Sequence, residues 1–316
     1  MMCLLLFAAG RAQDSSASPL QSAPAAEAAP ETIFHHSQTA RWWISGQDNV
    51  IFQAHGGFHS PYFGPNSLDS HGETATSNVV TLFTAFQFTP SFDVLFDLES
   101  AGGGGLSDAL GLAGFTNLDV VRNPTLGAKP YVARILLHKV FALSKDTQDQ
   151  QRNPVTSILT KLPVRRLELR IGKFGAADYF DLNSVGSDSH LQFLNWVADN
   201  NGSYDYAADT RGYTFGAIVE YQDRNWALRF GEMLMPKIAN GPHLDADLAR
   251  ARAENIELEL RPQLRKGRQT VVRLLTYINH ADMGSYKEAI AAFRSGTDVQ
   301  PTIEAHRKQG LSLIHI

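Results

Sequence analysis

Hydrophobic and polar residues alternate with a period of two along the middle of the chain. In residues 92–99 the even positions are apolar, whereas Asp93, Asp97 and Glu99 share the odd positions with Leu95. Because successive side chains point to opposite faces of a strand, this pattern predicts a β-strand with one apolar and one charged face. Similar patterns occur at residues 131–138, 166–171, 213–222, 226–230, 255–261 and 272–279. With the less regular segments 46–54 and 77–88, the sequence predicts about nine strands.

The strand predicted at 131–138 begins with a tyrosine. Strict alternation puts Tyr131 on the same face as Ile135 and Leu137, opposite Arg134 and His138. The phenol is then expected on the apolar face of the sheet.

Short turns and long connections separate these strands. The turns lie at 89–91, 222–225 and 262–268, and the longer connections at 101–129, 145–164, 174–211 and 235–252. Short turns at one end of the strands and long loops at the other are typical of an up-and-down outer-membrane barrel.

Two architectures explain the alternation. In a soluble β-sandwich the apolar face is the core, whereas in a membrane barrel it meets lipid and the charged face lines a wet lumen. Aromatic residues near strand ends favour the barrel, because they suit an interfacial girdle: Phe92, Tyr131, Tyr213, Tyr221 and Trp226. The fold class predicted is all-β, an antiparallel transmembrane β-barrel.

Composition narrows the classes of protein. The 316 residues are 43% hydrophobic and 19% charged, with a formal net charge of −4. That weak charge argues against a nucleic-acid partner, which would call for a basic patch. After the extreme N-terminus no apolar run is longer than five residues, whereas a transmembrane helix needs about 20 residues.

The two ends of the chain differ from its middle. Residues 1–12 are interpreted as a signal peptide, although no Lys or Arg precedes the apolar core, which favours a true start upstream. Cys3 lies within this segment. Residues 13–41 are predicted to be an Ala/Ser/Pro-rich linker, 42–310 the barrel, and 311–316 a tail that does not belong to the natural protein.

Several long motifs resemble the OprB family of carbohydrate-selective porins from Gram-negative outer membranes. They include residues 45–47, 59–62, 64–66, 99–130, 170–175 (RIGKFG), 178–183 (DYFDLN), 192–196 (QFLNW), 201–213 (NGSYDYAADTRGY) and 226–229. The resemblance covers roughly residues 42–285. It implies a barrel of roughly sixteen strands, passive diffusion and a preference for sugars. About nine strands cannot close such a barrel, so we expect the sequence to be an N-terminal fragment.

The polar residues suit binding rather than reaction. Arg offers a fork of donors to sugar hydroxyls, and carboxylates accept from them. The predicted lumen-facing, substrate-binding residues are Asp97, Glu99, Arg134, His138, Arg166, Glu168, Arg170, Arg229, Glu257 and Arg261. The 174–211 connection is the candidate constriction loop, with Tyr179, Phe180, Trp196, Tyr204 and Tyr206. For each charge, pairing with a neighbouring strand is the simpler explanation.

No catalytic residue, metal ligand or cofactor is predicted. His55, His59 and His71 are interpreted as loop histidines, since Gly and Pro break regular structure around them. The expected partners are sugars as solutes and outer-membrane lipid, with the oligomeric state open between monomer and homotrimer. The alternatives are a general outer-membrane pore, an outer-membrane barrel hydrolase, and a secreted glycan-binding β-sandwich.

Overall fold

The structure is a computed structural model of the chain. It describes residues 32, 34, 36–37, 39–64, 67–110, 127–263, 270–299 and 308–315, without the side chains of Trp196, Met283 and residues 308–315. The predicted signal peptide and most of the predicted linker lie outside the described residues, and both stay predictions.

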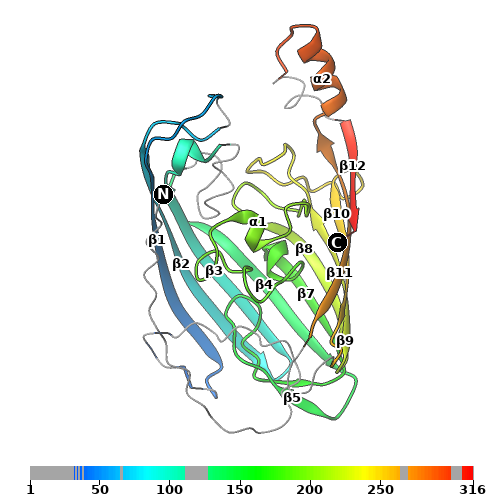
Figure 1. The fold of residues 1–316 in the computed structure, drawn as a ribbon. Coiled ribbons are helices and arrows are strands. Elements are labelled where there is room, and N and C mark those ends of the chain that lie inside the picture. Colours follow the sequence, from blue (N-terminus) through cyan, green and yellow to red (C-terminus); the bar gives the residue numbers. More distant parts are fainter. Residues whose placement is uncertain are drawn as a thin grey trace.

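Ten of the described strands form one antiparallel sheet (Figure 1). In order across the sheet they are β1 (Trp42–His55), β2 (Glu73–Thr89), β3 (Phe92–Gly103), β4 (Tyr131–Ala142), β7 (Arg166–Phe174), β8 (Thr214–Gln222), β9 (Trp226–Leu234), β10 (Arg252–Leu260), β11 (Val272–Met283) and β12 (Lys308–His315). The nine predicted strands correspond to the first nine of these. Residues 311–315, predicted to be a tail, lie within β12; their origin stays a prediction.

Smaller elements complete the described chain. They are the hairpin of β5 (Thr147–Asp149) and β6 (Lys161–Pro163), the 3-10 turns η1 (Leu106–Ala109) and η3 (Ala176–Asp178), and the helices α1 (Trp196–Asp199) and α2 (Tyr286–Arg294). No described helix is long and apolar enough to cross a membrane.

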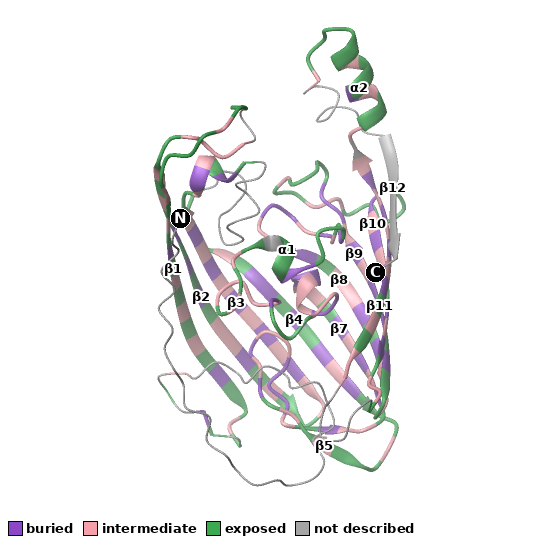
Figure 2. Cartoon of the chain, viewed as in Figure 1, coloured by how far each residue is buried: buried purple, intermediate pink, exposed green. Residues whose placement is uncertain are grey.

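The sheet curves into a trough, and its two faces differ in character (Figure 2). Buried and less buried residues alternate along the sheet strands whose side chains are described, and the buried set on β3 includes Asp93, Asp97 and Glu99. The exposed set is apolar, as with Leu137 on β4 and Ile256 on β10. The apolar face is therefore convex and outward, and the charged face is concave. This is the reverse of a sandwich, whose apolar faces pack against each other.

The predicted separation of short turns from long loops is correct with one exception. Residues 104–130, 175–213 and 235–251 connect strands at one end, and the turns at 90–91 and 223–225 lie at the other. The connection 143–165, however, joins β4 to β7 at the short-turn end, where it carries the β5–β6 hairpin (Figure 1). Placing every long connection at one end was therefore wrong, because length alone does not show which end a connection occupies.

A β-bulge corrects the prediction for Tyr131. Asp97 pairs with Arg134, but the next residue, Leu98, pairs with Val132, so Ala133 is an extra residue on β4. The bulge turns the Tyr131 side chain to the concave face, where its hydroxyl donates to Glu99. The predicted girdle also fails for Tyr213, which is buried. Trp226, in contrast, lies on the convex face, with its ring tilted against that of Tyr221 at a centroid distance of 4.9 Å.

We expect Gly172→Ala to weaken the pairing of β4 with β7. Gly172 has φ of +144°, and an added Cβ would overlap the carbonyl oxygen of Ile135. The free energy of unfolding should fall by more than about 1 kcal/mol, because alanine cannot adopt this backbone without strain. Denaturant titration in detergent measures it. The control is Gly46→Ala, where the nearest atom to the new Cβ lies 3.8 Å away; an equal loss in both variants would contradict the prediction.

Candidate functional site

A ladder of alternating charges crosses the concave face, beginning on β3. Asp93 accepts from Nδ1 of His138 at 2.8 Å, and Nε2 of the same imidazole lies 2.9 Å from Glu168 on β7. Asp93 and His138 are fully buried. Because carboxylates only accept hydrogen bonds, contacts at both ring nitrogens indicate a protonated imidazole.

The ladder continues through β7, β8 and β9. Glu168 is bound by Arg166 at 2.5 Å and by Arg170, and Arg170 reaches Glu220 on β8 at 3.0 Å. Glu220 in turn accepts from Arg229 on β9 at 2.6 Å. Glu220 therefore lies between two cations, and Glu168 contacts three.

The buried glutamates of β10 are also paired with arginines, from β9, from β11 and from the position just after β10. Arg229 pairs with Glu257, and Glu259 binds Arg261 at 2.7 Å and Arg273 at 2.9 Å. Glu257 and Glu259 are both nearly inaccessible to solvent. From Asp93 to Arg273 the charges form one compensated series over seven strands.

A second cluster lies on β3 and β4, closer to the long loops. Arg134 pairs with Asp97 at 3.2 Å and with Asp178 at 2.9 Å. Glu99 accepts from the hydroxyls of Tyr131 and Tyr213, the latter at 3.0 Å. Burial raises the pKa of Tyr213, so its phenol keeps the proton that it donates.

The 175–213 connection lies against this wall (Figure 1). Ionic and charge-assisted contacts fix its first part: Asp178 binds Arg134, the amide of Asp181 donates to Glu257 at 2.8 Å, and Arg273 donates to the carbonyl of Leu182 at 2.7 Å. These contacts join the connection to β4, β10 and β11.

Neutral groups fix the later part of the connection. Tyr277 donates to the carbonyl of Ser203 at 2.6 Å, and Asn279 donates to the carbonyl of Asp205. The amide of Asn255 donates to the hydroxyl of Tyr204. Burial raises the pKa of Tyr204, which keeps this phenol uncharged.

The aromatic residues of the connection pack on the wall. Tyr179, Phe180 and Tyr204 are buried in one cluster with strand residues such as Leu136 and Tyr277, and Tyr206 packs against its edge. The predicted loop therefore packs on the concave face and not only on its own aromatics. The side chain of Trp196 is outside the described residues.

The 143–165 connection covers the opposite end of the wall. Ser157 donates to Asp93 at 2.9 Å, and the amide of Ile158 does so at 2.7 Å. Arg152 donates to the carbonyls of Ser37 and Trp42, each at 2.9 Å. The connection thus reaches from β3 to β1.

All ten predicted lumen residues lie on the concave face, and most are buried. The structure brings them together in the ladder and the Arg134 cluster, so their side chains bind one another. Their contact with a solute stays a prediction. Asp178 and Asn255 were not among the predicted site residues, although Asn255 occupies an inward position of the predicted strand. The contact of Asp178 with Arg134 spans 44 residues, which no local pattern reveals.

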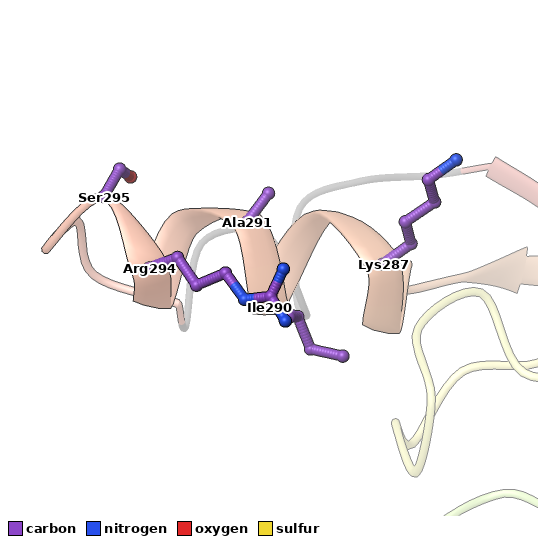
Figure 3. Close-up of a pocket in the computed structure, with 5 residues that line it drawn as sticks. All are labelled: Lys287, Ile290, Ala291, Arg294 and Ser295. Atoms are coloured by element: carbon purple, nitrogen blue, oxygen red, sulfur yellow. The ribbon is translucent and has the colours of Figure 1, made fainter.

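Other described features lie away from the wall. Among the described residues no group of three or more His, Cys, Asp and Glu side chains could hold a metal ion. His55 pairs with Glu73 at 3.0 Å, and His71 with Asp69 at 2.8 Å. A shallow hollow on α2, beyond the end of β11, is lined by Lys287, Ile290, Ala291, Arg294 and Ser295 (Figures 1 and 3).

The sequence matches no family model and no curated protein. Among solved structures, the chain is similar to Pseudomonas putida OprB, in a structure described as its high-pH form. The TM-score is 0.53 at 12% identity, over 87% of this chain and 60% of that one. The chain has an OprB-like porin fold. It spans 60% of the length of OprB.

We expect Glu168→Gln to destabilise the wall. The substitution leaves Arg166, Arg170 and His138 without a shared counter-charge, and removing one partner of a buried ion pair costs about 3 kcal/mol or more. Denaturant unfolding in detergent measures the loss. Glu232→Gln, on the convex face of β9, is the matched control and should change stability by less than about 0.5 kcal/mol. Equal losses would show that the ladder does not hold the wall together.

Proposed function

We propose that the protein is an outer-membrane porin that lets small neutral solutes, sugars above all, diffuse passively across the membrane. The observation that carries the proposal is the compensated charge ladder, on the concave side of an OprB-like sheet and beneath an inward-packed connection. It requires no catalysis and no cofactor.

The convex face supports a position in lipid. Large apolar side chains are exposed along it, for example Ile135 on β4, Phe230 on β9 and Leu274 on β11. An apolar face of this kind is stable in contact with lipid. A closed barrel also pairs the backbone N–H and C=O groups, which lipid cannot hydrogen-bond. The proposed location is the outer membrane of a Gram-negative bacterium.

The electrostatics of the concave face support a preference for neutral solutes. Glu168, Glu220 and Glu259 each lie between cations, so little net field remains to attract or repel an ion. A neutral solute needs no counter-charge along its route. The 175–213 connection narrows the route and provides the proposed constriction.

A general pore without sugar preference is the second candidate. The observation in its favour is that the predicted sugar-binding charges are mostly buried and bound to one another. The two candidates differ only in selectivity, which one experiment measures.

Swelling of liposomes that contain the folded protein tests the proposal. Rates should be higher with glucose and maltose than with uncharged amino acids of similar size. Protein inactivated by heating is the control for leakage. Equal rates for sugars and amino acids would favour the general pore, and no swelling from protein shown to be folded in the bilayer would refute both.

We expect Asn279→Ala to widen the range of solutes that pass. Asn279 holds the backbone at Asp205, and losing one neutral hydrogen bond costs about 1 kcal/mol, enough to loosen the loop without unfolding the sheet. The swelling rate with maltose should rise relative to glucose. Ile278→Val, on the convex face of the same strand, should leave that ratio unchanged; a ratio unchanged in both variants would contradict a constricting role for the connection.

A further inference from the structure

The concave face of β1 carries no ladder of charges. Its inward positions between Trp43 and His55 include Ser45, Gln47 and Asn49, and Gln53 follows on the same face. All four are uncharged and polar, three amides and the hydroxyl of Ser45, and we call them the amide strip. The strip lies at one side of the described sheet, two strands away from Asp93 and Asp97 on β3.

The register of the sheet shows that the strip faces the lumen side. Gln47 pairs with Thr81, whose hydroxyl donates to Glu99 on the concave face at 3.1 Å. Ser45 pairs with Phe83, which is only partly buried. Because paired residues share a face, the ring of Phe83 lies beside Ser45 on the concave face, one inward position from the amide of Gln47.

The strip also differs from the ladder in accessibility. Asp93 and His138 of the ladder are fully buried, whereas all four strip residues are half-buried. Among the residues that the structure describes, Gln47 makes no hydrogen bond through its side chain. Most ladder residues are nearly inaccessible to solvent and the strip residues are half-buried, so the strip is the more accessible polar surface for a solute.

The strip meets the inward-packed connection. The side-chain amide of Asn49 donates to the carbonyl of His190 at 3.1 Å, across 141 residues of sequence. At this point the 175–213 connection approaches β1 from the lumen side. The connection therefore contacts the strip directly at Asn49.

We infer that the amide strip, and not the charge ladder, is the surface that sugars contact; the inference rests on the proposed function and identifies the part of the wall that recognises the solute. An amide both donates and accepts, as a sugar hydroxyl does, so Gln47 and Asn49 match a hydroxyl in either role. Phe83 adds an apolar surface for the C–H groups of a sugar ring. Neutral groups of this kind hold a sugar weakly enough to release it.

Two substitutions on the strip and one matched control test the inference. Gln47→Ala and Asn49→Ala remove the amides, and Asp48→Ala changes the residue between them, which faces the convex side. In liposome swelling, the rate with glucose relative to an uncharged amino acid of similar size should fall roughly two- to tenfold in the strip variants, the factor for losing one neutral hydrogen bond. It should not fall in Asp48→Ala.

Binding of maltose provides a readout that does not need a pore. Saturation-transfer NMR on detergent-folded protein should show maltose signals that weaken in Gln47→Ala and persist in Asp48→Ala. If both strip variants keep the parent's sugar preference and maltose signals, the inference is overturned, while swelling by the parent still supports the proposed function. If the parent binds maltose through Gln47 but causes no swelling, the proposed function fails. The strip is then still supported as the surface that sugars contact.

Discussion

The buried charges of the concave wall are tolerated because each lies beside groups of opposite charge. A single carboxylate such as Glu168 would cost several kcal/mol, on the order of a whole protein's stability margin, if it were buried alone. Arg166, Arg170 and His138 remove that cost together. Arg152 uses a different solution, because carbonyl oxygens and the ring of Trp43 surround its guanidinium in place of a carboxylate.

Compensation also explains how loops can cover a charged wall. The 175–213 connection brings its own acceptors and donors to the strands, from Asp178 near its start to Tyr213 at its end. Between them, neutral bonds through Asn255, Tyr277 and Asn279 hold its middle. The wall thus keeps its charges paired, and the concave face of β1 presents uncharged, half-buried side chains such as Gln47.

The sequence was sufficient to predict nine strands and the face of most residues on them, since alternation with a period of two is a local property. It was not sufficient for Tyr131, because one extra residue at Ala133 shifts the alternation without any mark in composition. The anchors of the connection could not be predicted either: Asp178 and Arg134 lie 44 residues apart, and Asn49 and His190 lie 141 apart. The alternation of charged and apolar residues predicted which side chains face the concave side. That these side chains are buried and bind one another is seen only in the structure.

The bulge at Ala133 has a genetic consequence. Deleting that one codon would remove the bulge and leave Tyr131 opposite Glu99, because Val132 already pairs with Leu98 and Arg134 with Asp97. No charged or aromatic residue would be lost, and both phenols beside Glu99 would stay on the concave face. The bulge therefore lets this strand carry one residue more without a change of face at Tyr131.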